Sequence, residues 1–191
     1  MSVRRVVVAA LIVLASAGAR RAPAQSAGPR VEIVVPRAAH DAPITGRVYV
    51  AISRTSSAES TPIAQAEETG APLFGADVDA LAPGTAAVID ASAFGHPVRS
   101  LRDIPAGTYW VQPFVNVYTK FARADGHPVW LHMDQWEGQD WRHSPGNLYG
   151  EPVRVTIDPA SPAPIRLVAD HVIPPIVVSR DSGNVRRLKI R

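Results

Sequence analysis

The stretch PVRSLRDIPAGTYWVQPFVNVY (residues 97–118) decides the fold. From Tyr109 to Tyr118 the side chains alternate between two faces, and both faces are largely apolar, which predicts a central β-strand covered on both sides. The preceding turn, Ile104-Pro105-Ala106-Gly107, should reverse the chain between two strands, because proline presets its first corner and glycine tolerates a positive φ at its last. Pro113 has no N–H group, so we expect a bulge or a lost hydrogen bond where it enters the sheet.

Similar short strands are predicted along the rest of the chain. Between 54 and 79 the sequence has little periodicity, which indicates a long, mobile excursion with one helical turn near 63–68. Seven or eight short strands without a sustained helical period predict an all-β protein, an antiparallel β-sandwich of the immunoglobulin-like or transthyretin-like kind. Besides the two strands around the turn, the predicted strands cover 30–35, 46–53, 86–92, 129–133, 151–158 and 163–173.

The first 24 residues have the pattern of a secretory signal peptide. Arg4 and Arg5 precede an apolar run over 6–17, and small residues lead to a cleavage site near Ala24, with Ala19 as the second choice. The apolar run is shorter than the roughly 20 residues that span a bilayer. An uncleaved anchor is the alternative, because two further arginines crowd the cleavage site. We expect a periplasmic or extracellular protein without a membrane span after cleavage.

The remaining chain is expected to form one domain. After a linker over 25–29, the β-sandwich should cover 30–178, and 179–191 should be a basic tail or the start of a following domain. The sequence contains 0 Cys, which excludes thiol catalysis, cysteine-based zinc sites and disulfide bonds. A domain of this size can be held together by its own apolar core.

The charge does not indicate a nucleic-acid partner. The chain has 20 Lys and Arg against 17 Asp and Glu, but four of the arginines lie in the leader, and without them the net charge is −1. The basic residues at the end of the chain have no aromatic residues between them and match no nucleic-acid motif.

The segment WLHMDQWEGQDWRHSPGNLYG (residues 130–150) holds three of the 4 Trp and two of the 6 His. Its first ligand hypothesis is a metal site, with oxygen ligands that suit Ca²⁺ or histidines that suit Zn²⁺. No established metal-binding spacing is present. The candidate metal ligands, of which the first two should share one face of a strand, are His132, Asp134, Glu137, Asp140 and His143.

A second hypothesis for the same segment is a sugar or peptide site that combines aromatic stacking with hydrogen bonds. The alternative that we favour is a tied loop, in which Trp136 and Trp141 cover one end of the sandwich while Asp140, Asn147 and the Ser144-Pro145-Gly146 turn hold the backbone. The candidate ligand-binding residues are Trp130, Trp136, Trp141, Asn147 and Tyr149.

No catalytic residue is predicted. The nucleophile-elbow pattern G-x-S-x-G is absent, and Ser144 and Ser182, which have glycines nearby, lack its spacing. A serine triad needs a poised nucleophile, and the sequence offers none.

Residues 101–159 contain NVYT, RADGH, HMDQWEGQ and SPGNLY in this order. This signature resembles the N-terminal β-sandwich leader domain of secreted bacterial esterases, which precedes an α/β-hydrolase domain of the enterochelin-esterase type. Weaker similarity extends over 30–191. The chain stops at NVRRLKIR, about where those proteins begin the hydrolase domain, so no catalytic residue of that family can be assigned here. The resemblance implies a truncated or split esterase, or a free-standing accessory domain.

These observations together predict a non-catalytic, exported accessory or binding domain. An α/β-hydrolase domain or a cell-envelope component would be its partner. The alternative is a stand-alone periplasmic protein that binds a metal or a carbohydrate through the loop between His132 and His143. A divalent metal is the one cofactor that the sequence raises.

Overall fold

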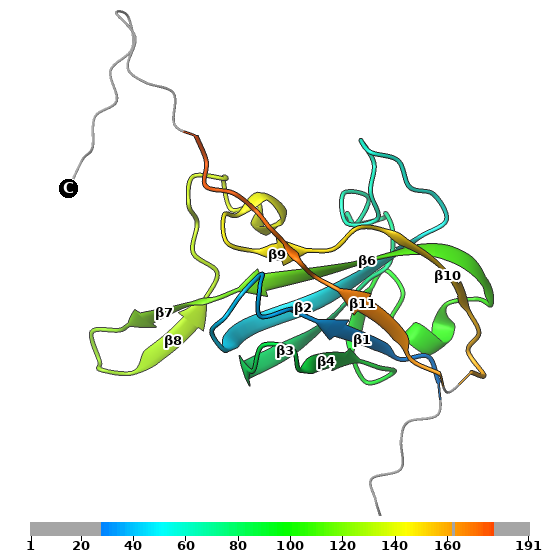
Figure 1. Ribbon diagram of the computed structural model, residues 1–191, viewed down its shortest axis with the longest axis horizontal. Coiled ribbons are helices and arrows are strands. Elements are labelled where there is room, and N and C mark those ends of the chain that lie inside the picture. The colour runs from blue at the N-terminus through cyan, green and yellow to red at the C-terminus, as the bar shows by residue number, and fades with distance from the viewer. Residues whose placement is uncertain (1–27, 162, 178–191) are drawn as a thin grey trace, which may run out of the picture.

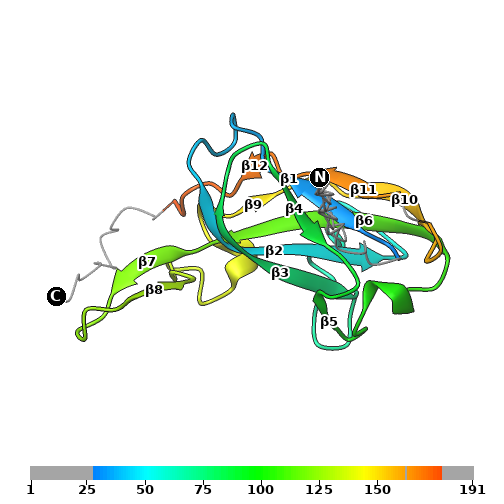
Figure 2. The ribbon, with the colours of Figure 1, turned by 90° about the horizontal axis from the view of Figure 1, so that it is seen from below.

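A computed structural model describes residues 28–161 and 163–177. Nearly all of its regular structure is β-strand, and two sheets lie face to face as the layers of a sandwich (Figures 1 and 2). The all-β sandwich predicted from the sequence is therefore confirmed. The predicted signal peptide and the basic tail at 179–191 lie outside the described residues, and within the described part no helix is long and apolar enough to cross a membrane.

The smaller sheet has three strands. β1 is central, pairing with β4 in the antiparallel sense and with β11 in the parallel sense. The parallel pair departs from the predicted antiparallel sandwich. It arises because β11 joins the far side of β1 only after the chain has passed through the other sheet. The strands in spatial order are β11 (Ile165–Val168), β1 (Val31–Val34) and β4 (Ala86–Ile89).

The larger sheet has seven strands, and its central strand β6 is the one predicted from the alternating stretch. β6 pairs with β2 on one side and with both β9 and β10 on the other. The spatial order is β12 (His171–Val172), β9 (Leu148–Tyr149), β6 (Gly107–Val117), β2 (Ile44–Ser53), β3 (Leu73–Leu81) and β5 (Phe94–His96), with β10 (Val153–Ile157) also on β6.

A separate hairpin of β7 (Thr119–Ala122) and β8 (Pro128–Leu131) extends from the body at the left of Figure 1. Its turn contains Gly126 at φ 82°. The described residues thus form twelve strands rather than seven or eight, because several predicted strands are divided and two have only two residues.

The main core fills the space between the two sheets. Alternate residues of β2 and β6 point inward and meet the inward face of the smaller sheet, where burial of apolar area drives folding. Fully buried contributors from both layers include Val31, Ile33, Val48, Val50, Val111, Val115 and Ile89.

Pro113 divides the strand that lies beside β6. The register places Phe114 opposite Tyr149 and Val111 opposite Val153, so one extra residue lies between β9 and β10. Gly150 N donates to Pro113 O at 3.2 Å, but Pro113 cannot return a bond. The side-chain Nε2 of Gln112 donates to Gly150 O at 3.0 Å instead. Both the bulge and the lost hydrogen bond predicted for Pro113 are present.

Two local predictions were wrong. The strand expected before the Pro-x-Gly turn is replaced by a cis His96–Pro97 bond and a 3-10 helix, η1 (Leu101–Asp103), whose N-cap Ser100 accepts from Arg102 N. The strand β3 was missed, because its inward residues alternate with glycine and aspartate and give only a weak apolar pattern.

Within the long, mobile excursion predicted over 54–79, hydrogen bonds tie the 54–72 segment to the outer face of the larger sheet. Ser53 Oγ donates to Gln65 Oε1 at 2.5 Å, and Gln65 Nε2 donates to Ser60 O at 2.7 Å. Ile63 N donates to Gln112 Oε1 at 3.0 Å. Gln112 therefore links this segment to the strand break at Gly150.

The outer face of the larger sheet carries one row of aromatic residues across its strands. The strand register places these residues directly opposite one another from one edge of the sheet to the other. Side chains at directly opposite positions of neighbouring strands are close enough to interact. Gly75 is the gap in this row. In order, the row is Phe94, Gly75, Tyr49, Phe114, Tyr149 and His171.

Candidate functional site

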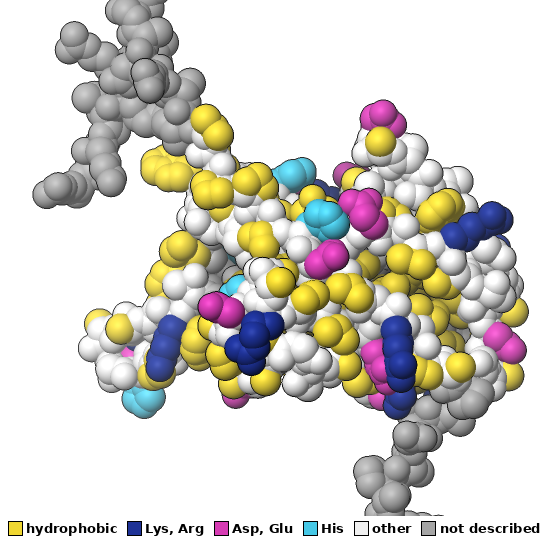
Figure 3. Space-filling view, in the orientation of Figure 1, with side chains coloured by type: hydrophobic (Ala, Val, Ile, Leu, Met, Phe, Trp, Pro, Cys, Tyr) yellow, Lys and Arg dark blue, Asp and Glu magenta, His cyan; other side chains and the backbone are white. Residues whose placement is uncertain are grey.

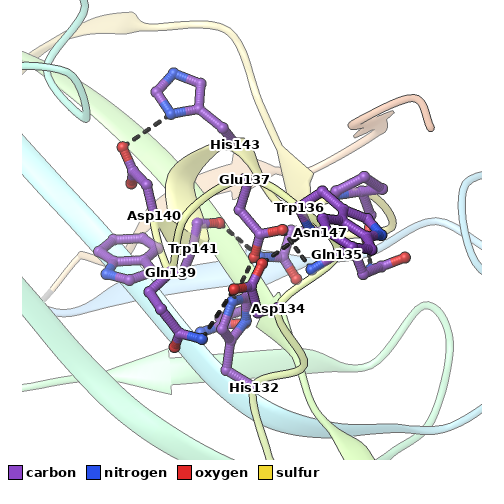
Figure 4. A network of polar contacts seen from close by, with 12 residues as sticks. His132, Asp134, Gln135, Trp136, Glu137, Gln139, Asp140, Trp141, His143 and Asn147 are labelled. Carbon is purple, nitrogen blue, oxygen red and sulfur yellow. Dashed lines mark hydrogen bonds and ion pairs between the residues drawn. The ribbon is translucent and has the colours of Figure 1, made fainter. Parts of the chain in front are cut away.

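The Trp-rich loop (residues 132–147) lies beyond β8 and packs against the outer face of the larger sheet. A contact between His132 and the buried carboxylate of Glu137 holds its beginning (Figure 4). His132 Nε2 is 2.9 Å from Glu137 Oε1, and His132 Nδ1 is 3.1 Å from Asn116 Oδ1 on β6. The side chain of Glu137 is only 1% exposed. A carboxylate buried this deeply has to be paired to be tolerated, and here it closes the loop onto the sheet.

Hydrogen bonds keep Glu137 ionised. Burial raises its pKa, but the backbone N–H groups of Glu137 and Gln135 and the side chains of His132 and Ser144 outweigh burial, and the pKa falls below its ordinary value. Gln135 N donates to Glu137 Oε2 at 2.5 Å. The ionised carboxylate of Glu137 therefore stabilises the folded conformation of the loop.

The tip of the loop holds Trp136 in solvent. Asp134 Oδ1 accepts from Trp136 N at 2.8 Å, and Asp134 Oδ2 accepts from Gln139 Nε2 at 3.0 Å. Trp136, Gly138 and Gln139 have φ of 81°, 73° and 68°, a tight turn of left-handed residues. The Trp136 side chain is 88% exposed.

Asp140 fixes the second half of the loop. It caps the 3-10 helix η2 (Trp141–His143), and its carboxylate accepts from Arg142 Nε at 2.9 Å. His143 Nδ1 lies 2.9 Å from Asp140 Oδ2. Hydrogen bonds from the Arg142 side chain outweigh burial and, with those from His143 and the Arg142 backbone, lower the pKa of Asp140. The predicted role of Asp140 in tying the loop is confirmed.

Asn147 anchors the end of the loop to the sheet. Its side chain is buried, with Nδ2 donating to Trp141 O at 2.7 Å and Oδ1 accepting from Val117 N at 2.8 Å. Asn147 was predicted both as a loop tie and as a ligand-binding residue. The structure gives it the first role, because both ends of its amide are already engaged.

The predicted metal ligands do not converge. His132 pairs with Glu137, Asp134 closes the Trp136 turn, and Asp140 binds Arg142 and His143 some way along the loop (Figure 4). Among the described residues, no three His, Cys, Asp or Glu side chains are placed to hold a metal ion. The five predicted ligands are thus not brought together around one point. Asp134, Glu137, Asp140 and His143 recur every three residues in the sequence, but the tight turn at 136–139 points their side chains to different places.

The aromatic candidates are dispersed. Trp141 stacks on Tyr49 with ring centroids 4.7 Å apart and meets Phe114 edge-on at 5.0 Å, so it packs as predicted, but on the outer face of the larger sheet rather than over one end of the sandwich. Trp136 covers nothing, and its predicted lid role was wrong. Trp130 lies on β8 with 42% exposure, and Tyr149 stacks on His171 at 5.1 Å.

The loop contains the three residue types of a serine triad, namely Ser144, Glu137 and His132, but their spatial arrangement differs from that of a triad. Glu137 lies between the other two and bonds with both. In a triad the histidine lies between the serine and the acid, so that it can take the proton of the nucleophile. Ser144 is also only 1% exposed. This arrangement is suited to holding the loop and not to acyl transfer.

Sequence reasoning missed Asn116, Gln112 and Gln135 as supports of the loop region. Gln135 Nε2 donates to Pro145 O at 2.6 Å across the loop. The signal for Asn116 and Gln112 was available, since both are amides that recur on one face of an otherwise apolar strand. A buried amide of this kind needs partners from a neighbouring segment.

An exposed apolar surface lies beside the loop tip. We call it the Trp136 surface. It surrounds an open hollow of about 380 Å³, and its apolar lining is Met133, Trp136, Pro145, Pro175 and Ile176, with Asp134 and Gln135 as the polar part. Figure 3 shows hydrophobic side chains gathered here, towards the upper left, where the described chain ends. An aromatic residue held in solvent by a fixed turn is typical of a binding surface.

Comparison with family models, with curated proteins and with solved structures found no match for this chain.

Proposed function

We propose that this chain is a non-catalytic, exported β-sandwich domain that binds an α/β-hydrolase domain through the Trp136 surface. The observation that carries the proposal is the contrast within one loop. The charged side chains hold the backbone, while Trp136, one of the two tryptophans of the loop, is 88% exposed. An organised loop of this kind loses little conformational entropy on binding.

The hydrolase partner follows from the resemblance of residues 101–159 to esterase leader domains. In those proteins the hydrolase domain comes directly after the sandwich. Pro175 and Ile176, close to the end of the described chain, line the same surface as Trp136. A partner tethered there would meet the Trp136 surface at a high effective concentration.

Isothermal titration of the full-length chain tests this interaction. The probe is an α/β-hydrolase domain of the enterochelin-esterase type, taken from a secreted esterase that carries the same leader signature. Trp136→Ala should weaken binding by at least about tenfold, as expected for a buried aromatic anchor. Phe94→Ala removes another exposed aromatic ring on a distant strand and is the matched control. Absence of binding by the unaltered chain, or equal loss in both variants, would contradict the proposal.

A second measurement tests the non-catalytic part. The chain alone should not hydrolyse p-nitrophenyl acetate above the buffer rate and should form no covalent adduct with a fluorophosphonate probe. An adduct on Ser144 would show that the loop is an active site and would overturn the proposal.

A further inference from the structure

A second hollow surface lies on the outer face of the larger sheet, away from the Trp136 surface. It begins at the gap in the aromatic row, where Gly75 separates Phe94 from Tyr49. An open hollow of about 270 Å³ lies there, with Phe94 and Tyr49 among its walls. The Phe94 side chain is 73% exposed. Arg47 and Tyr49 fill the space directly over Gly75, so the hollow lies beyond these two side chains and beside Phe94.

A neighbouring hollow of about 470 Å³ lies between the 54–72 segment and the loop residues 138–142. Both hollows are lined by Ala66 and Glu67, and we call the two neighbouring hollows together the sheet groove. Tyr49 lines the first hollow and Trp141 lines the second, and these two rings stack on each other. One stacked aromatic pair therefore borders both hollows.

The walls of the groove are fixed. His96 on β5 lies with Nε2 at 2.7 Å from Glu68 O, which holds the 54–72 segment at the position where Glu67 and Glu68 reach the rim. On the other side, Asp140 holds Arg142 through contacts at 2.9 Å and 3.3 Å. A site whose walls are held in place before binding has the preorganisation that recognition requires.

The charges of the rim favour a neutral ligand. Arg47 is already paired with Asp77 at 2.8 Å, and Arg142 with Asp140. Among the described residues, Glu67 and Glu68 have no ion-pair partner within 4.0 Å, although the charge of Glu67 acts on Arg142 across the groove. The rim thus offers both hydrogen-bond donors and acceptors, with a small excess of negative charge that disfavours phosphates and acidic polymers.

From this geometry we infer that the sheet groove binds a neutral oligosaccharide. The apolar face of a pyranose ring packs on an aromatic ring, and its hydroxyls bond to charged planar side chains of the kind that line this rim. Phe94 and Trp141 supply the platforms, because the Tyr49 ring is already engaged by Trp141 and Arg47, and Glu67, Glu68 and Arg142 supply the polar contacts. A peptide is less suitable, because the strands beneath the groove are already paired and offer no free ladder for a peptide backbone.

Affinity electrophoresis of the full-length chain tests the groove. The probes are gels that contain glucomannan, arabinoxylan, laminarin or pullulan, with polygalacturonate as the acidic comparison and denatured casein as the peptide comparison. At least one neutral polysaccharide should retard the chain. Phe94→Ala and Glu67→Gln should each weaken this retardation by about tenfold, the effect expected for one lost stacking contact or one lost charged hydrogen bond. Thermal unfolding of both variants should match that of the unaltered chain, because both side chains are exposed.

Trp136→Ala is the matched control, since it removes an exposed indole outside the groove and should leave retardation unchanged. Retardation by no neutral polysaccharide, stronger retardation by polygalacturonate or casein, or equal loss in Trp136→Ala would each overturn the inference. The Phe94 and Trp136 variants exchange roles in the hydrolase-binding experiment. Failure of one proposal is therefore distinguishable from failure of the other.

Discussion

Trp136 and Trp141 belong to one short loop, yet the backbone gives them opposite environments. A positive φ at Trp136 turns its side chain into solvent, while the capped turn of η2 places Trp141 over Tyr49 and Phe114. Residue type alone predicts burial for both, because tryptophan is highly buried on average. The turn at 136–139 decides which of the two is covered.

Replacement of Trp141 should destabilise the fold, whereas replacement of Trp136 should not. Trp141→Ala removes the aromatic cover of the sheet and should lower the free energy of unfolding by about 2–4 kcal/mol, somewhat less than for a fully buried ring. Trp136→Ala should stay within about 0.5 kcal/mol, as for other exposed positions. Urea unfolding followed by far-UV circular dichroism measures both values. A similar large loss in both variants would show that Trp136 is packed after all.

The charge of Glu137 should give the fold an acid-sensitive component. Its pKa in the folded protein is below the ordinary value of 4.5, so its contribution to stability is present above pH 4.5 and is lost as the pH falls through the lowered pKa. Glu137→Gln cannot ionise and should remove this component. The measurement is the midpoint of urea unfolding of both proteins between pH 7 and pH 3. The curves should converge at the acidic end, and parallel curves would rule out this role for Glu137.

At the scale of the elements, Pro113 explains why one strand becomes two. A central strand can contain proline only where the neighbouring ladder tolerates a missing donor. Here the chain opposite Pro113 bulges between β9 and β10, and Gln112 supplies the missing hydrogen bond to Gly150 O. The same side chain accepts from Ile63 N, so one buried amide joins the strand break to the 54–72 segment.

Removal of the Gln112 amide should loosen both attachments. Gln112→Ala leaves Gly150 O and Ile63 N without these partners and should lower the free energy of unfolding by about 1–3 kcal/mol. The control is Arg154→Ala on the exposed side of β10, which should have little effect. Hydrogen exchange by mass spectrometry should show faster exchange in 54–72 for the Gln112 variant only. Unchanged exchange there would show that other contacts suffice to hold this segment.

At the scale of the whole molecule, the two sheets share one apolar core, and the β7–β8 hairpin lies outside it. The core cluster takes residues from both layers but none from the hairpin. A two-stranded hairpin has little stability of its own in water, whereas strands that share a core unfold together. The molecule should therefore contain one cooperative body and one weakly protected projection.

Amide hydrogen exchange of the native protein checks this division. The amides of β7 and β8 should exchange at least about 100-fold faster than those of β2 and β6, because local opening of the hairpin exposes no core. Tryptophan fluorescence and far-UV circular dichroism should report the same unfolding midpoint, since Trp141 packs on the cooperative body. Protection of the hairpin equal to that of β6 would indicate that it is part of the body.

The sequence by itself determined the all-β sandwich, the central position of β6, the irregularity at Pro113 and the ties made by Asp140 and Asn147. Alternation, the missing N–H group and the Asp140 cap act within a few residues along the chain, whereas the Asn147 side chain also reaches Val117 N, 30 residues away. Only the tertiary structure decided the parallel pairing of β1 with β11, the separation of the five expected metal ligands, the burial of Trp141 rather than Trp136 and the groove beside Gly75. Each of these depends on which distant segments meet across the sheet, and the sequence does not show these contacts because register and turn geometry fix them only after the layers pack.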